Sequence, residues 1–184
     1  FCKKHPHANV SITIKSRNEL IHWEGGEHFD VALVSLPFEQ RVFKKKAFVS
    51  FSAVVAVSKN DPLHMKKIIT IEDLKNKNLI SLDPTGIFQT SIRKKFEELN
   101  IEPIVKIQTT SMLQSAQLVA NDIGIAIIDP FIGHIISNNN ILIKPLEPSI
   151  NFNYAYIWPE GRELSALAKE FISEIANIAK KISK

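Results

Sequence analysis

Short apolar runs alternate along most of the chain with longer segments in which apolar residues recur every three or four positions. The short runs are typical of buried strands, and the longer segments are typical of amphipathic helices. We expect strands at 10–14, 31–36, 78–83, 103–109, 124–129, 141–146 and 152–159, and at 47–59 two strands in series or one strand that bends. We expect helices at 17–25, 88–100, 111–122, 131–137 and 162–183. This alternation predicts an α/β fold built from parallel βαβ units.

The pattern also predicts two lobes without a flexible linker. Two α/β halves are joined only by extended segments, near 50–53 and again near 148–151. The first lobe is expected to comprise 1–52 and 149–184, and the second 53–148. Because the chain crosses twice through strands, we expect two Rossmann-like lobes with a ligand cleft between them and a stiff hinge.

Composition narrows the class of protein. The chain has 184 residues, 45% of them hydrophobic, and a mean hydropathy of −0.01, which is typical of a globular protein with a substantial core. No apolar run approaches the 18 or more residues of a membrane span. The net charge is +4, and its densest runs, at 44–46 and 179–184, are expected to be solvated surface, so this chain by itself is not expected to bind DNA. A single cysteine, Cys2, rules out an internal disulfide.

Motifs for catalysis, metals and cofactors are missing from the sequence. The six histidines are scattered, and no HExxH or CxxC occurs, so we expect no metal. There is no GxSxG for a nucleophile, and neither a phosphate-binding loop nor GxGxxG for a nucleotide cofactor. We therefore expect no cofactor and no enzymatic activity.

Polar residues recur where the predicted strands end. They are Ser16, Arg17, Ser35, Thr85, Gly86, Thr110, Ser111 and Asp129. In open parallel sheets, ligands bind outside the carboxyl ends of the strands, and helix N-termini at those ends bind anions. The same residue types are also preferred helix caps and turn formers. Each residue alone fits a cap better than a ligand contact, so the hypothesis of a binding site depends on the set.

Five motifs, in their order and spacing, point to one family. They are FCKKHP at 1–6, HFDVALV at 28–34, VVAVSKNDPL at 54–63, IEDLKNKNLISLD at 71–83 and LVANDIGIAIIDPF at 118–131. Together they resemble the effector-binding domain of LysR-type transcriptional regulators over nearly the whole chain. Two positions depart from the family pattern, since Asp122 and Glu27 stand where glycine is usual. Asp tolerates a left-handed backbone better than most residues, so the first change is mild.

The resemblance implies a type 2 periplasmic-binding-protein-like fold and a small-molecule effector held between the lobes. It also implies a cytoplasmic homodimer or homotetramer, in which the helix 88–100 of one chain meets the first lobe of its partner. DNA binding would be carried by an N-terminal helix-turn-helix that is not part of this sequence, which we interpret as truncated at its N-terminus. Asp129-Pro130-Phe131 resembles the subgroup that includes LysR itself and the opine-responsive regulators, which implies an amino-acid-like effector.

Chemical roles follow for several residues of the expected site. Arg17 is suited to pair with a ligand carboxylate, Asp129 with an ammonium group, and Phe131 with an aliphatic part. Two alternatives stay open. One is a secreted or membrane-tethered solute receptor of the same fold, which needs an upstream signal sequence. The other is an enzyme on a similar scaffold, such as a dehydratase, which needs an acid or base in the cleft.

Overall fold

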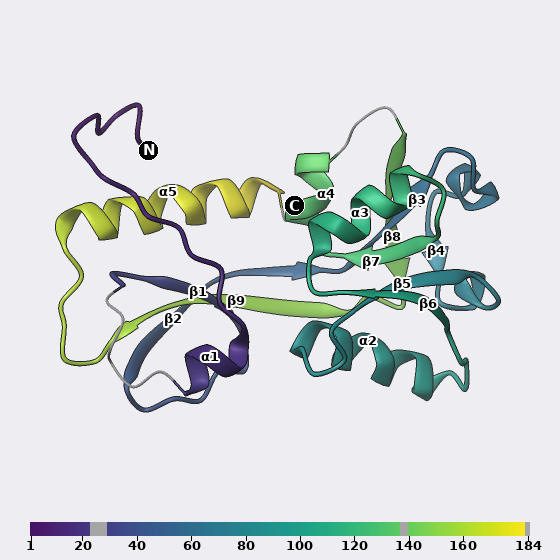
Figure 1. Cartoon of the computed structure of the whole chain (residues 1–184), viewed down its shortest axis with the longest axis horizontal. Coiled ribbons are helices and arrows are strands. Elements are labelled where there is room, and N and C mark those ends of the chain that lie inside the picture. Colours follow the sequence, from purple (N-terminus) through teal and green to yellow (C-terminus); the bar gives the residue numbers. More distant parts are fainter. Residues whose placement is uncertain (23–28, 137–139, 183–184) are drawn as a thin grey trace. The chain divides into compact units, whose positions relative to one another are not determined.

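The computed structural model describes residues 1–22, 29–136 and 140–182, and they form two compact units. The first unit comprises Phe1–Val49 and Asn153–Lys181, and the second Ser50–Phe152 with Ile182. Strands β2 and β9 (Figure 1) each continue from one unit into the other, as the predicted crossover strands should. The unit boundaries lie a few residues from the lobe limits expected from the sequence.

The first unit is built on a three-stranded sheet with the order β1-β9-β2. The bounds are β1 Ala32–Ser35, β2 Phe43–Ser52, β9 Asn151–Pro159, and for the helices α1 Arg17–Ile21 and α5 Ala166–Ile182. Strand β1 runs antiparallel to β9, from Ala32 opposite Ile157 to Ser35 opposite Tyr154. The core of this unit is a cluster of buried side chains, namely Val34, Phe38, Phe43, Ala155 and Ile157.

One sequence-based expectation for the first unit is wrong. No strand forms at 10–14, where Val10, Ile12 and Ile14 are 43%, 82% and 94% exposed. An alternating pattern makes a strand possible, but the strand forms only where a neighbour completes its ladder, and none is assigned here. Helix α5 begins at Ala166 rather than at the predicted residue 162, and its buried positions include Ala168 and Ile172. The predicted helix at 17–25 ends at Ile21, and its residues 23–25 lie outside the described residues.

The second unit is built on a six-stranded sheet with the order β4-β8-β3-β7-β5-β6. The strands are β3 Val54–Ser58, β4 Ile69–Thr70, β5 Asn78–Leu82, β6 Ile104–Thr109, β7 Ile125–Ile128 and β8 Ile141–Glu147. Strand β5 is parallel to both β6 and β7, as predicted, but β3 is antiparallel to β7 and β8. The sheet is therefore mixed. The apolar run of β3 fits a buried strand of either direction, because direction depends on pairing with distant segments.

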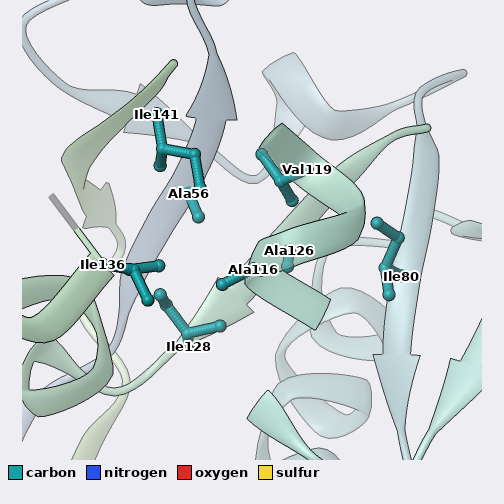
Figure 2. Packing of buried hydrophobic residues seen from close by; sticks show 8 residues of the cluster. All are labelled: Ala56, Ile80, Ala116, Val119, Ala126, Ile128, Ile136 and Ile141. Atoms are coloured by element: carbon teal, nitrogen blue, oxygen red, sulfur yellow. The ribbon is translucent and has the colours of Figure 1, made fainter. Parts of the chain in front are cut away.

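Helices cover both faces of this sheet (Figure 1). The bounds are α2 Ile87–Glu98, α3 Met112–Ala120 and α4 Pro130–Ile136, with short 3-10 turns η1 Pro62–Met65 and η2 Glu72–Leu74. Helices α3 and α4 pack on one face and α2 on the other. Alternate residues of β7 therefore face opposite helices: Ala126 and Ile128 belong to the α3–α4 core shown in Figure 2, and Ile127 faces α2.

Local turn chemistry in the second unit follows the sequence closely. A capping box is present before η2, since Asp73 N donates to Thr70 Oγ1 at 3.3 Å and Thr70 N donates to Asp73 Oδ2 at 3.0 Å. Asp122 has a φ of 61°, the left-handed backbone expected where the family usually has glycine. Its carboxylate accepts hydrogen bonds from Ser58 and Asn60, which lower the pKa of Asp122. Side-chain bonds of this kind hold the left-handed backbone at this position although its residue is not a glycine.

Candidate functional site

The carboxyl ends of three parallel strands meet at one edge of the six-stranded sheet. Leu82 at the end of β5 is opposite Thr109 at the end of β6, and Ile80 of β5 is opposite Ala126 of β7. The turns that follow these strands therefore leave the sheet at the same edge, which we call the ligand edge. It carries six of the nine residues predicted for the site: Thr85, Gly86, Thr110, Ser111, Asp129 and Phe131.

Helix α2 begins at the ligand edge without a side-chain cap. Its N-cap residue is Gly86, which has no side chain to accept a hydrogen bond. The preceding carboxylate, Asp83, instead accepts from Thr85 Oγ1 at 2.7 Å and from Thr85 N at 2.8 Å. These two bonds, with the hydroxyl contributing most, lower the pKa of Asp83. An uncapped helix start presents N–H groups and a partial positive charge, which suit an anion such as a carboxylate.

Helix α3 begins with a complete set of local hydrogen bonds. Ser111 Oγ accepts from Gln114 N at 3.4 Å, and Ser111 N donates to Thr109 Oγ1 at 3.1 Å. Ser111 is thus a helix cap in this structure, which is the structural role that the sequence analysis set against a ligand contact. The neighbouring Thr110 is exposed.

Helix α4 begins with a buried acid. Asp129 is 6% exposed, and its Oδ1 accepts from Ile132 N at 2.7 Å. It therefore caps α4 and places a negative charge at the ligand edge. The next aromatic, Phe131, packs edge-on against Phe51, with ring centroids 5.2 Å apart. The acid expected to receive an ammonium group thus also has a structural role.

A row of four aromatic rings, which the sequence did not indicate, joins the start of α4 to the start of α2. After Phe131 and Phe51, the row continues through Phe152 at 5.6 Å to Phe88 at 4.4 Å, both in stacked geometry. Phe51 and Phe152 come from β2 and β9, at the end of each crossover strand that belongs to the second unit. The contacts among these rings could not be predicted, because contacts between distant segments leave no local pattern. The sequence indicated only that Phe51 and Phe152 lie in or next to the crossover strands.

In the first unit the structure brings together the other three predicted residues. Ser16 caps α1 in a capping box with Glu19, through hydrogen bonds of 2.6 and 3.2 Å. Arg17 Nη1 donates to the carbonyl oxygen of Ser35 at 3.1 Å, and Nη2 donates to that of Pro37. Its guanidinium carbon is 5.2 Å from the centroid of the Phe38 ring, and burial lowers the pKa of Arg17. Since a guanidinium has five N–H donors, three remain for other acceptors.

Within the described residues, no three side chains of His, Cys, Asp or Glu come together as a metal site requires. None of the helices that the structure describes is long and apolar enough to cross a bilayer.

Comparison with known proteins gives the family. Residues 1–179 match the family model described as LysR substrate binding domain. The chain therefore belongs to this family of regulatory, non-enzymatic domains, as the motifs predicted. It is 21% identical over 171 residues to the transcriptional activator protein LysR of Escherichia coli strain K12, covering 93% of this chain and 55% of LysR. The chain thus spans little more than half the length of that relative.

Solved structures show the same fold. The regulatory domain of CcmR from Synechocystis PCC6803, in complex with 2-PG, aligns with a TM-score of 0.77 and 18% identity, over 97% of this chain and 87% of that one. The effector-binding domain of QuiR in complex with shikimate aligns with a TM-score of 0.65 and 22% identity, over 83% and 73%. The predicted type 2 periplasmic-binding-protein-like fold is confirmed.

Proposed function

We propose that this chain is the effector-sensing domain of a LysR-type transcriptional regulator and that it binds a small carboxylated ligand at the ligand edge. The observation that carries the proposal is the uncapped start of α2 at Gly86. It stands beside the ends of β6 and β7, at an edge where α3 and α4 are capped by their own side chains. A carboxylate would supply the acceptors that the protein does not provide there.

The narrower form of the proposal is an amino-acid-like effector. Its carboxylate would bind the N–H groups at the start of α2, with Thr85, Thr110 and Ser111 as polar neighbours. Its ammonium group would be attracted to Asp129, and its hydrocarbon part would pack on Phe131. Among similar proteins, QuiR has been solved with shikimate, itself a small carboxylic acid, which supports a carboxylated ligand.

Ser16, Arg17 and Ser35 are proposed as contacts from the first unit. Arg17 is the strongest of the three, because its remaining N–H donors carry a full charge and match a carboxylate geometrically. Ser16 is the weakest, since its side chain and its backbone N–H both take part in the capping box. That one ligand is shared by both units stays a prediction.

We further propose that ligand binding shifts the population of domain arrangements in a homodimer or homotetramer and so controls transcription. A ligand can do this only by binding one arrangement more tightly than another. Helix α2 is proposed as one side of the contact with the partner's first unit. DNA binding would belong to a helix-turn-helix elsewhere in the parent protein, which would act in the cytoplasm.

A thermal-shift screen tests the proposal. The chain is melted with amino acids, opines and aromatic acids, each paired with its methyl ester or amide as a control without the carboxylate. A true effector raises the melting temperature with concentration, and its ester does not. If esters and acids shift the melting temperature equally, the carboxylate has no role at α2. If no compound in a broad screen shifts it, the sensor proposal fails in favour of a domain that serves oligomerisation.

A further inference from the structure

A cavity lies on the opposite face of the sheet from α3 and α4, where α2 passes over β5 and β6. It has a volume of about 150 Å³. An apolar cavity of about this size in another protein admits benzene. The residues that line it include none of Thr85, Thr110 or Asp129. It adjoins the ligand edge at Pro84, but none of the nine predicted site residues lines it.

The cavity owes part of its lining to a bulge in the edge strand. Leu79 of β5 is opposite Val105, but the next residue of β5, Ile80, is opposite Ile107, so Lys106 is an extra residue in β6. In a regular strand, residues three apart face opposite sides. Because of the extra residue, Val105 and Gln108 both line the cavity. The bulge thus places one apolar and one amide side chain of β6 at the same space.

The inner wall is apolar and well packed. It is formed by Ile92 and Phe96 of α2, which are 3% and 1% exposed, and by Leu79 and Ile127 of the sheet, each 6% exposed. Pro103 adds a wall that has no N–H to satisfy. A ring or a compact hydrocarbon suits such a surface better than a chain of polar groups.

The outer wall supplies hydrogen-bond donors and one charge. Among the described residues that line the cavity, Arg93 alone is charged. Its Nε faces Glu97 Oε1 at 3.6 Å, and both side chains are more than half exposed, so this ion pair is weak. Gln89 Oε1 accepts from Leu82 N at 3.2 Å, which leaves the amide N–H donors of Gln89 for another partner. A cation beside amide donors attracts a carboxylate.

We propose that this cavity is a second binding site, for a small acid with one ring and one carboxylate. The ring is held by Ile92, Phe96 and Val105, and the carboxylate by Arg93 with help from Gln89 and Gln108. The bulge and the apolar wall set the size of the ring, and Arg93 sets the charge. This site does not depend on the proposed effector site.

The test uses 4-fluorobenzoate as the acid and 4-fluorotoluene as its neutral counterpart, each titrated into the full chain and followed by fluorine NMR. We expect 4-fluorobenzoate to bind with a dissociation constant on the order of 1 mM. Arg93→Gln should weaken it about tenfold and change 4-fluorotoluene binding less than twofold. The matched control is Lys94→Gln, which removes the same charge from the next, exposed residue of α2 and should leave both probes bound.

A second variant tests whether the probes bind in the cavity, independently of the charge of Arg93. Val105 is 48% exposed on an edge strand, so Val105→Trp can be accommodated while its larger side chain occupies the cavity, and both probes should be lost. If that variant fails to fold by circular dichroism, Gln108→Phe, from an exposed position on the same strand, serves instead. Retained binding of both probes in a folded cavity-filling variant overturns the proposal.

Other outcomes separate this site from the ligand edge. If Arg93→Gln and Lys94→Gln weaken 4-fluorobenzoate equally, the effect is surface charge and the site is not real. If Thr85→Val abolishes binding and Arg93→Gln does not, the acid binds at the ligand edge, so this inference fails while the proposed function stands. If Arg93→Gln weakens binding and Thr85→Val does not, the second site stands even where the effector screen finds nothing.

Discussion

Helices α2 and α4 both begin at the ligand edge, but only α4 has a side chain that caps its N-terminus. At α4 the protein supplies its own anion, because the buried Asp129 carboxylate accepts from Ile132 N. At α2 it supplies none, since Gly86 has no side chain and the nearby Asp83 carboxylate is bound to Thr85. One helix N-terminus is therefore satisfied by the protein itself, and the other has N–H groups that suit an anionic ligand. The proposed ligand, with a carboxylate and an ammonium group, would place one group at each of these helix starts.

The largest expected effect comes from breaking the aromatic row that joins the two helix starts. Phe51 is 4% exposed and contacts both Phe131 and Phe152. We expect Phe51→Ala to destabilise the protein by about 3 kcal/mol or more, because it removes a large buried side chain and leaves a cavity. Urea unfolding measures this. The control is Phe48→Ala, whose ring is only partly buried and which should cost less; an equal loss would show that the row has no special role.

Removing the cap of α4 tests whether Asp129 is structural, functional or both. Asp129→Ala leaves Ile132 N without its acceptor, so we expect a loss of about 1–2 kcal/mol in unfolding free energy together with loss of the effector's thermal shift. Asp129→Asn keeps an acceptor oxygen without the charge. If Asn restores stability but not the effector response, the charge binds the ligand. If Asn restores both, Asp129 is a cap and nothing more.

Supplying a cap to α2 would remove the difference between the two helices. Gly86 has an ordinary φ of −71°, and an added Cβ would be 3.3 Å from the carbonyl oxygen of Asp83, so a small side chain needs only a slight adjustment. We expect Gly86→Asp to weaken the binding of an anionic effector at least tenfold. The new aspartate carboxylate would occupy the N–H groups at the start of α2 and repel the negative charge of the effector. Gly86→Asn is the uncharged match and should weaken the effector less. Equal binding by wild type, Gly86→Asp and Gly86→Asn, measured by calorimetry, would place the ligand carboxylate elsewhere.

These helix starts also show how much of the candidate site could be predicted from the sequence. Residues that follow parallel strands were expected to gather at one edge of the sheet. Strands β5, β6 and β7 are parallel and bring them there. The strands themselves could be predicted because their apolar pattern is a local signal. Which of them are caps was not decidable, since Ser111 and Asp129 look the same in sequence whether they cap a helix or bind a ligand. Gly86 was identified as part of the set, but its missing cap is visible only once the partner of Asp83 is known.

Features that depend on distant pairing were missed. Phe51 and Phe152 stack although they are far apart in the chain, and the sequence around either residue does not indicate the contact. The segment 10–14 has a strand-like pattern but no strand, because the pattern records which side chains are apolar and not whether a neighbouring strand is present. Local periodicity therefore predicted most elements, and non-local contacts decided the rest.

The smallest expected effect concerns the carboxylate that does not cap α2. The hydrogen bonds from Thr85 lower the pKa of Asp83 in the folded protein, below the value of about 3.9 usual for an unfolded chain. A group with a depressed folded pKa stabilises the protein above its unfolded pKa, and that contribution is lost as the pH falls through the folded pKa. Thr85→Val removes the stronger of the two bonds, so the difference in unfolding free energy between wild type and variant should shrink as the pH falls below about 4. Thr85→Ser keeps a hydroxyl and should follow the wild type, whereas a difference that stays constant with pH would mean that Thr85 acts by packing. Asp83 would then not be held away from α2 by this bond, and the contrast between the two helix starts would rest on Gly86 alone.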